Sequence, residues 1–254
     1  VVGQTSQSTP QSTISQTLTN NTNVRDSVIY TVYAIGNGVG CGRDTFLIKV
    51  YVNPKPRMLD TTLTICSGQS FTVAPTNQQP NQIVPAGTTY TWTVASVASG
   101  LTGGASGSGV SITGSLFNGT DSVKTIVYNV IAIGNVVGCG RDTFLITVNV
   151  NPAPRVVFSP LGPQTICSGD TTRTVTISSP TPGANTPWVS MSPLPTGLTG
   201  VTLGGTNTIP SQTLINNTNA PITLVDSAQA VTSGGTTCPG TKTPYIFIIN
   251  PKPR

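Results

Sequence analysis

Two nearly identical stretches decide the fold: YTVYAIGNGVGCGRDTFLIKVYVNPKPR at residues 30–57 and YNVIAIGNVVGCGRDTFLITVNVNPAPR at residues 128–155. They agree at 22 of 28 positions, and a more divergent copy, CPGTKTPYIFIINPKPR, occupies residues 238–254. The copies end at residues 57, 155 and 254, so they are 98 and 99 residues apart. This spacing is the length of one small domain and is far longer than one turn of a solenoid.

We therefore predict three units: 1–57, the C-terminal part of a first repeat; 58–155, a second repeat; and 156–254, a third. The front part of the first repeat is expected to lie outside the sequence. The third repeat has drifted, because Tyr128 has no aromatic counterpart near Val225.

In the last strand expected in the first repeat, Phe46, Ile48, Val50 and Val52 lie on one face and Leu47, Lys49 and Tyr51 on the other. This period of two is typical of strands. Proline-containing linkers such as NPKPR then stop the strand. Further strands are expected over Thr13–Thr19, Thr88–Ala95, Lys124–Ile133 and Thr143–Asn151, with Trp92 in the core. About seven short strands per repeat, separated by Gly- and Pro-rich turns, predict an all-β chain of tandem immunoglobulin-like β-sandwich domains.

The composition argues against catalysis. The chain has no His, and its seven acidic residues are all Asp, so it lacks the usual groups for general acid–base chemistry. We predict no enzyme activity and no cofactor. Each repeat has two or three Asp far apart in sequence, whereas calcium requires six to eight oxygens. We therefore predict no metal site, with calcium kept as the alternative.

The positive charge does not indicate a nucleic-acid partner. The net charge of +5 comes from scattered residues without the clustering and aromatics of a nucleic-acid surface. Five of the basic residues lie in the linkers: Lys55, Arg57, Arg155, Lys252 and Arg254. No apolar run approaches the ~20 residues of a membrane span, so we predict no membrane insertion.

The five cysteines form an even set once the repeat is considered. Cys66 and Cys167 follow a first strand, Cys139 and Cys238 precede a last strand, and Cys41 is the second member for the first repeat. We predict Cys66–Cys139 and Cys167–Cys238 disulfides, with Cys41 paired to a residue outside the sequence. In the common immunoglobulin topology, however, these positions lie at opposite ends of a sandwich. The alternatives are a bridge from Cys41 to Cys66 and unpaired buried thiols.

Two short polar motifs recur. The Asn-x-Thr sequons at Asn20, Asn118 and Asn216 occur once per repeat, and we interpret them as turns rather than glycosylation acceptors. Every Asp is followed by Ser or Thr, which is typical of turns and strand entries.

The ordered motifs TICSGQSFTVAPTN (64–77), TTYTWTV (88–94), SQTLTNNT (15–22) and TVNVNPAP (147–154), with a Cys before the final strand, carry a resemblance. Over essentially the whole chain, the sequence resembles the PKD-like, immunoglobulin-like repeats of giant cell-surface adhesins of the Bacteroidota. That group includes gliding-motility adhesins exported by type IX secretion.

The resemblance implies an extracellular, cell-surface stalk that presents an adhesive region, with neighbouring repeats of the same chain as partners. One alternative is a polysaccharide-binding module, for which Tyr33, Tyr51, Trp92 and Trp188 are the aromatic candidates. Another is a fibre in which like chains assemble by strand complementation.

The resemblance also implies O-glycans at Asp-Ser or Asp-Thr pairs followed by a small or aliphatic residue. Five hydroxyls fit this pattern: Ser27, Thr61, Ser122, Thr171 and Ser227. Thr45 and Thr143 do not fit it, because each is followed by Phe.

Overall fold

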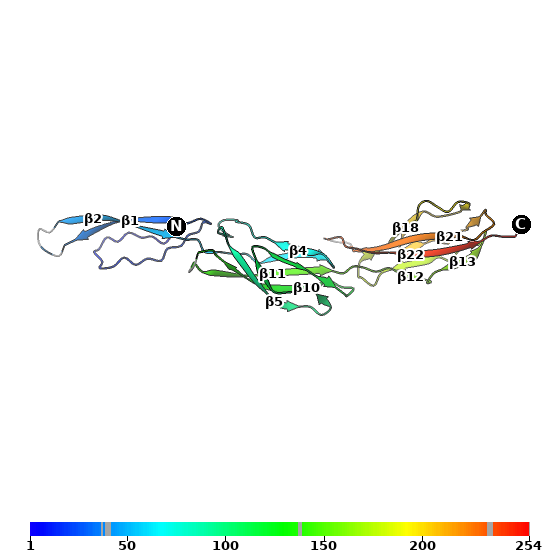
Figure 1. Cartoon of the computed structure of the whole chain (residues 1–254), viewed down its shortest axis with the longest axis horizontal. Coiled ribbons are helices and arrows are strands. Elements are labelled where there is room, and N and C mark those ends of the chain that lie inside the picture. The colour runs from blue at the N-terminus through cyan, green and yellow to red at the C-terminus, as the bar shows by residue number, and fades with distance from the viewer. Residues whose placement is uncertain (37, 39–41, 137–138, 233–235, 254) are drawn as a thin grey trace.

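The structure is a computed structural model and describes residues 1–36, 38, 42–136, 139–232 and 236–253. All regular elements within these ranges are strands, and they form units that follow one another along the long axis of the molecule (Figure 1). The prediction of an all-β chain of tandem immunoglobulin-like sandwiches is confirmed. Within the same ranges, no helix has the length and apolarity needed to cross a bilayer.

The first unit is a single long hairpin in which β1 (Asp26–Ile35) pairs antiparallel with β2 (Arg43–Val52). The preceding segment is irregular, and the strand predicted over Thr13–Thr19 is wrong. Within that segment Thr19 alone forms a backbone β-bridge, through two hydrogen bonds with Val2. Cys41, which falls between β1 and β2 in the sequence, lies outside the described residues.

The second unit has a five-stranded sheet in the order β3-β11-β10-β5-β7, faced by the β4-β8 pair and joined by the short β6-β9 pair. Its strands are β3 (Thr61–Cys66), β4 (Ser70–Val73), β5 (Thr89–Val97), β6 (Leu101–Thr102), β7 (Gly107–Gly109), β8 (Ile112–Ser115), β9 (Phe117–Asn118), β10 (Lys124–Ile133) and β11 (Arg141–Asn151). The first strand, β3, runs parallel to the last, β11, with Cys66 opposite Asn151. Both strands therefore end at the same end of the unit.

The core of the second unit is built on the predicted alternation. Trp92 is buried at 7% exposure, as expected, and its ring lies against Gly107, where a Cβ atom would meet the indole at 2.5 Å. Tyr90 packs edge-on against Phe144, with ring centroids 6.3 Å apart. Aromatic and β-branched residues thus fill the space between the two layers.

The third unit repeats the plan with a six-stranded sheet, in which β13-β22-β21-β16-β18 are ordered side by side and β15 pairs with β21. Its strands are β12 (Val157–Ser159), β13 (Gln164–Cys167), β14 (Val175–Ser178), β15 (Ala184–Asn185), β16 (Pro187–Ser190), β17 (Leu198–Thr199), β18 (Gly204–Thr206), β19 (Thr208–Ile209), β20 (Ile215–Asn216), β21 (Ile222–Thr232) and β22 (Pro239–Asn250). Again the first long-sheet strand, β13, is parallel to the last, β22.

The two complete cores differ in polarity at one level. In the second unit Tyr128 pairs in register with Val94 and Ile146, and its ring packs against Phe71 at 5.9 Å. In the third unit the same register position, opposite Ser190 and Tyr245, is occupied by Asp226. The third sandwich therefore carries a buried carboxyl group where the second carries a tyrosine.

Candidate functional site

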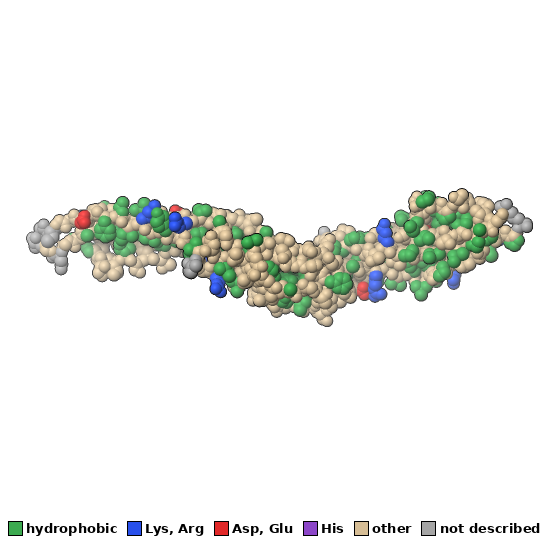
Figure 2. Space-filling model, in the orientation of Figure 1, with side chains coloured by type: hydrophobic (Ala, Val, Ile, Leu, Met, Phe, Trp, Pro, Cys, Tyr) green, Lys and Arg blue, Asp and Glu red, His purple; other side chains and the backbone are tan. Residues whose placement is uncertain are grey.

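The described residues hold no group of three or more His, Cys, Asp or Glu side chains that could bind a metal ion. Charged side chains are few and scattered on the face that Figure 2 shows. The most elaborate feature is instead the junction between the second and third units, where a linker, a disulfide and side-chain hydrogen bonds meet.

Cys66 and Cys238 form a disulfide with Cα atoms 5.5 Å apart and a sequence separation of 172. It joins the second unit to the third. Both predicted pairs, Cys66–Cys139 and Cys167–Cys238, are therefore wrong. The physical reason is the topology: Cys66 lies at the C-terminal end of its sandwich and Cys139 in the loop at the N-terminal end. Cys139 and Cys167 are free thiols; Cys139 is half-buried and Cys167 is exposed.

The junction is closed around this disulfide. The two sulfur-bearing residues are 8% and 1% exposed. Asn151, beside Cys66 in the sheet, donates a 3.2 Å hydrogen bond from Nδ2 to the carbonyl of Thr236 in the loop that carries Cys238. On the outside, Arg155 of the linker forms an ion pair with Asp121 at 3.2 Å. In the chain-entropy model, a bridge over a loop this long stabilises the folded state by about 5 kcal/mol.

At the junction between the first and second units, two hydrogen bonds hold the first residues of the second unit to its last strand, and a third joins the two units. The carboxylate of Asp142 accepts a 2.6 Å hydrogen bond from the backbone N–H of Met58, the residue that follows the linker. Asp60 accepts a 2.7 Å hydrogen bond from the N–H of Leu145, and Gln79 donates to Asn23 across the junction at 2.9 Å. The Arg-Asp-Thr-Phe segment thus fixes the point where the linker enters the second unit.

The Asn-x-Thr motifs form one structural corner per unit, which agrees with their interpretation as turns. Asn118, which is buried, donates from Nδ2 to the carbonyls of Ser122 and Val150, both at 2.8 Å. Its Oδ1 accepts hydrogen bonds from the N–H and the hydroxyl of Thr120. Asn216 makes the same four bonds in the third unit.

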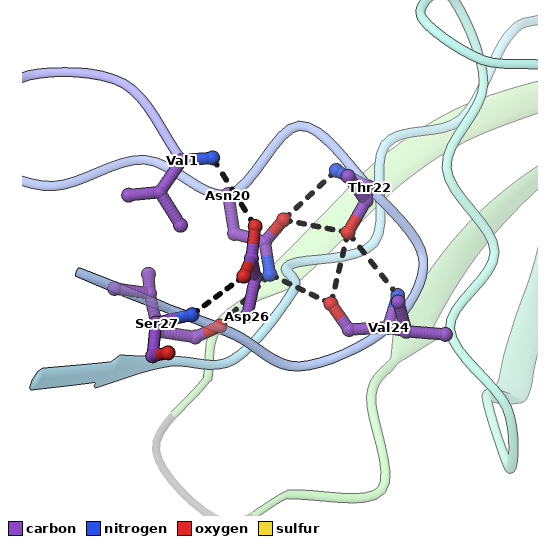
Figure 3. A network of polar contacts seen from close by, with 7 residues as sticks. Val1, Asn20, Thr22, Val24, Asp26 and Ser27 are labelled. Carbon is purple, nitrogen blue, oxygen red and sulfur yellow. Dashed lines mark hydrogen bonds and ion pairs between the residues drawn. The ribbon is translucent and has the colours of Figure 1, made fainter.

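The corner of the first unit is drawn in Figure 3, where Asn20 bonds to Thr22 and to the carbonyl of Val24. Its fourth bond runs to the carbonyl of Val52 on the last strand. Because the amide is fully engaged, each corner ties a loop to the strand that leads into the linker.

The remaining candidate residues do not gather into one site. Trp92 and Trp188 are buried, so they present no surface to a polysaccharide. Tyr33 and Tyr51 are exposed at 62% and 54%. Among the five predicted O-glycan acceptors, Ser122 and Thr171 are exposed and the other three are half-buried: Ser27, Thr61 and Ser227.

Sequence reasoning missed the bridge between units. One feature of the sequence pointed to it: the two cysteines of a repeat are expected at opposite ends of its sandwich, too far apart to bond to each other. When two repeats follow one another, the cysteine at the end of the first lies close to the cysteine at the start of the second.

Comparison with solved structures gives low overall similarity. Extracellular cadherin domains 1–5 of protocadherin gamma B2 match at 12% identity and a TM-score of 0.35, over 91% of this chain and 46% of that one. A structure of mouse clustered PcdhgC3 matches at 12% identity and a TM-score of 0.31, and the match covers 92% of this chain and 79% of that one. A three-Ig-domain titin variant matches at 14% identity and a TM-score of 0.33, and the match covers 90% of this chain and 75% of that one. The chain thus spans about half the length of the first of these structures.

No curated protein sequence matches the chain. A family model described as a PKD-like domain matches residues 1–56 and 63–154, which is more than half of the sequence. The chain therefore belongs to the PKD-like domain family.

Proposed function

We propose that the chain is a non-enzymatic structural segment of a large bacterial surface adhesin or extracellular filament, a rigid stalk that holds an adhesive region away from the cell. The observation that carries this proposal is the doubly tied junction, in which the linker and the Cys66–Cys238 disulfide both connect the second unit to the third. Two covalent connections between the same two bodies restrict bending far more than one linker does.

The proposed location of the stalk is extracellular. Disulfides persist in oxidising compartments, which supports this location. Attachment to the cell surface, export by type IX secretion and a role in gliding rest on the sequence resemblance. We propose repeat boundaries at 1–57, 58–155 and 156–254, because one buried cluster runs from Met58 to Val150 and the next from Phe158 to Ile249.

Small-angle X-ray scattering tests the rigid junction. The oxidised chain should give the pair-distance distribution of a single elongated shape, with a well-defined maximum dimension. The Cys66→Ser/Cys238→Ser double variant should give a broader distribution and a smaller radius of gyration. Cys139→Ser/Cys167→Ser is the matched control and should scatter like the parent. Identical broad curves for parent and double variant would contradict the rigid stalk.

O-glycans are the proposed decoration of the stalk. Ser122 and Thr171 are exposed and accessible to a transferase, whereas Ser227 is half-buried inside β21 beside the buried Asp226. We propose glycans on the five predicted hydroxyls and none on Thr45 or Thr143. Peptide mass spectrometry of protein from a Bacteroidota host checks this: unmodified peptides at all five positions would eliminate the idea.

Polysaccharide binding is a second candidate, supported by one exposed arrangement on the first unit. The Arg25 guanidinium and the Lys49 ammonium lie 4.6 and 4.9 Å from the ring centroid of Tyr51. An aromatic flanked by cations suits an acidic sugar. A glycan array should then lose its signal with Tyr51→Ala and keep it with Tyr245→Phe; a blank array for the parent favours the stalk alone.

Strand-complemented assembly is a third candidate, because β1 and β2 form a two-stranded sheet whereas their counterparts β10 and β11 sit within five strands. Analytical ultracentrifugation distinguishes it. Concentration-dependent oligomers under reducing conditions would support it, and monomers at all concentrations would exclude it.

A further inference from the structure

Each complete unit contains two parallel strands that lead to the same junction. In the second unit β3 and β11 run side by side from Thr61 opposite Ile146 to Cys66 opposite Asn151. In the third unit β13 and β22 do the same, ending with Cys167 opposite Asn250. These strands are the first and last of their large sheets and both point toward the C-terminal end of the unit.

At the observed junction, both strands continue covalently into the third unit. The last strand, β11, continues through the linker into β12 and β13. The first strand, β3, continues through the Cys66–Cys238 disulfide into β22. The connections exchange partners: a last strand leads to a first strand, and a first strand leads to a last strand.

Cys167 lies in the same structural setting as Cys66. The residue after each cysteine donates its N–H to the last strand, Ser67 to Asn151 at 2.9 Å and Ser168 to Asn250 at 2.8 Å. Each of these serine hydroxyls also accepts a 2.9 Å hydrogen bond from the N–H of the corner asparagine in its unit. The two cysteines differ in burial, because the third unit covers Cys66 while Cys167 is exposed.

Cys139 corresponds in the same way to Cys238. Both lie in the loop between the last two strands of their sheet, Cys139 two residues before β11 and Cys238 one residue before β22. Both loops face the unit that precedes them. Gly140, next to Cys139, lies against the Lys55 side chain of the linker that precedes the second unit. Gly240 lies against the backbone of Pro154 in the linker that precedes the third unit.

We propose that Cys167 and Cys139 are modification sites, each forming a disulfide with a neighbouring repeat. Cys167 would bond to the Cys238-type cysteine of a repeat placed after it, and Cys139 to the Cys66-type cysteine of a repeat before it. This inference rests on the proposed stalk, in which such repeats adjoin. Two covalent strands then run through every repeat and cross every junction.

The chemistry needs an oxidant, which we take to be a small-molecule disulfide such as oxidised glutathione. One cysteine thiolate attacks it, forming a mixed disulfide and releasing one glutathione thiolate. The second cysteine thiolate then attacks the protein sulfur of the mixed disulfide and releases the other. Two protons leave the cysteines, and the two electrons reside in two reduced glutathiones.

The test extends the full chain by one repeat. Residues 250–254 read NPKPR, identical to the linker at 53–57, so a second copy of residues 58–155 appended after residue 254 recreates the junction that precedes the second unit. Cys41→Ser is introduced throughout. After oxidation with glutathione, peptide mapping should find Cys167 linked to the copy of Cys139, alongside Cys66 linked to Cys238. Alkylation of Cys167 should fall at least tenfold relative to the unextended chain.

Two further proteins make the result decisive. Changing the appended copy of Cys139 to Ser should restore full alkylation of Cys167. Appending residues 156–254 instead supplies the loop already seen in a bridge, and its copy of Cys238 should capture Cys167. If Cys167 stays reactive in both extended chains while the Cys66–Cys238 bridge is intact, the inference is overturned. The stalk proposal would survive that outcome, since its scattering test depends on the existing bridge alone.

Discussion

The backbone N–H of Met58 donates a 2.6 Å hydrogen bond to Oδ2 of Asp142, although the two residues are 84 positions apart in sequence. This bond secures the first residues of the second unit to its last strand. A charge-assisted hydrogen bond of this kind contributes about 2 kcal/mol, and its loss leaves a partly buried donor unpaired. Asp142 is thus a residue of the junction, and its role explains one position of the Arg-Asp-Thr-Phe segment.

Asp142→Ala should therefore lower the unfolding free energy of the second unit by about 2 kcal/mol. The chain has two tryptophans, one in each complete unit. In a Trp188→Phe background, urea denaturation followed by fluorescence reports on the second unit through Trp92. The matched control is Asp44→Ala, since Asp44 bonds locally to the N–H of Thr45. A control that loses as much as Asp142→Ala would contradict the assignment.

Asn118→Ala should be the most damaging single change in the second unit. It removes four hydrogen bonds at once and leaves the buried carbonyl of Val150 without this donor. The expected loss is about 4 kcal/mol, against about 1 kcal/mol for Thr120→Val, which removes only the hydroxyl. The same fluorescence titration measures both variants, with Asn129→Ala on the exposed face as control. Equal losses for all three would refute a structural corner.

The strands and the core could be predicted from the sequence, whereas the contacts at the junctions could not. The strand at Lys124–Ile133 is observed with the predicted limits, because its alternation and flanking turns are local signals. Trp92 is in the core for the same reason. The predicted cysteine pairing is wrong because an even count says only that cysteines can pair. The choice between a partner in the same repeat and one in the next depends on the ends of the sandwich at which the strands terminate. Sequence spacing does not encode that choice.

The buried carboxyl group of the third unit illustrates a second limit. The absence of an aromatic counterpart to Tyr128 is visible in the sequence, but its consequence depends on burial. Asp226 is 1% exposed, and this burial raises its pKa to about 6 against a smaller opposing effect of Ser190. Ser190 Oγ lies 2.6 Å from Asp226 Oδ1 and 3.0 Å from the carbonyl of Thr202. One hydroxyl hydrogen cannot serve both acceptors, so both contacts are hydrogen bonds only when Asp226 is protonated.

The third unit should therefore lose stability as the pH rises. The pKa of Asp226 is higher in the folded state, about 6, than its ordinary value of 3.8, so the folded state binds more protons between these values. The stabilising contribution is complete below pH 3.8 and is lost as the pH rises through about 6. The total change is about 3 kcal/mol.

Urea titrations between pH 4 and 8 in a Trp92→Phe background measure this through Trp188. Asp226→Asn keeps the side-chain shape without a titrating group and should flatten the dependence. The second unit, with Tyr128 at the equivalent position, is the control: in the Trp188→Phe background its stability, followed through Trp92, should vary little over the same range. A parent third unit whose stability rises with pH would contradict the assignment.

The Cys66–Cys238 bridge should also shield most of the chain from tension. Force applied at the two termini passes from Cys66 to Cys238 through the sulfur atoms and bypasses a sequence separation of 172. At ~3.4 Å per extended residue this conceals about 600 Å of contour length. Optical-tweezer traces of the oxidised chain should lack that extension.

Reduction, or Cys66→Ser, should restore it as two unfolding steps of about 300 Å each, because each repeat then bears the load itself. Cys167→Ser, which leaves the bridge intact, should pull like the oxidised parent. Full extension without reductant would mean that the two units are not bridged, and the rigid junction would lose its covalent basis.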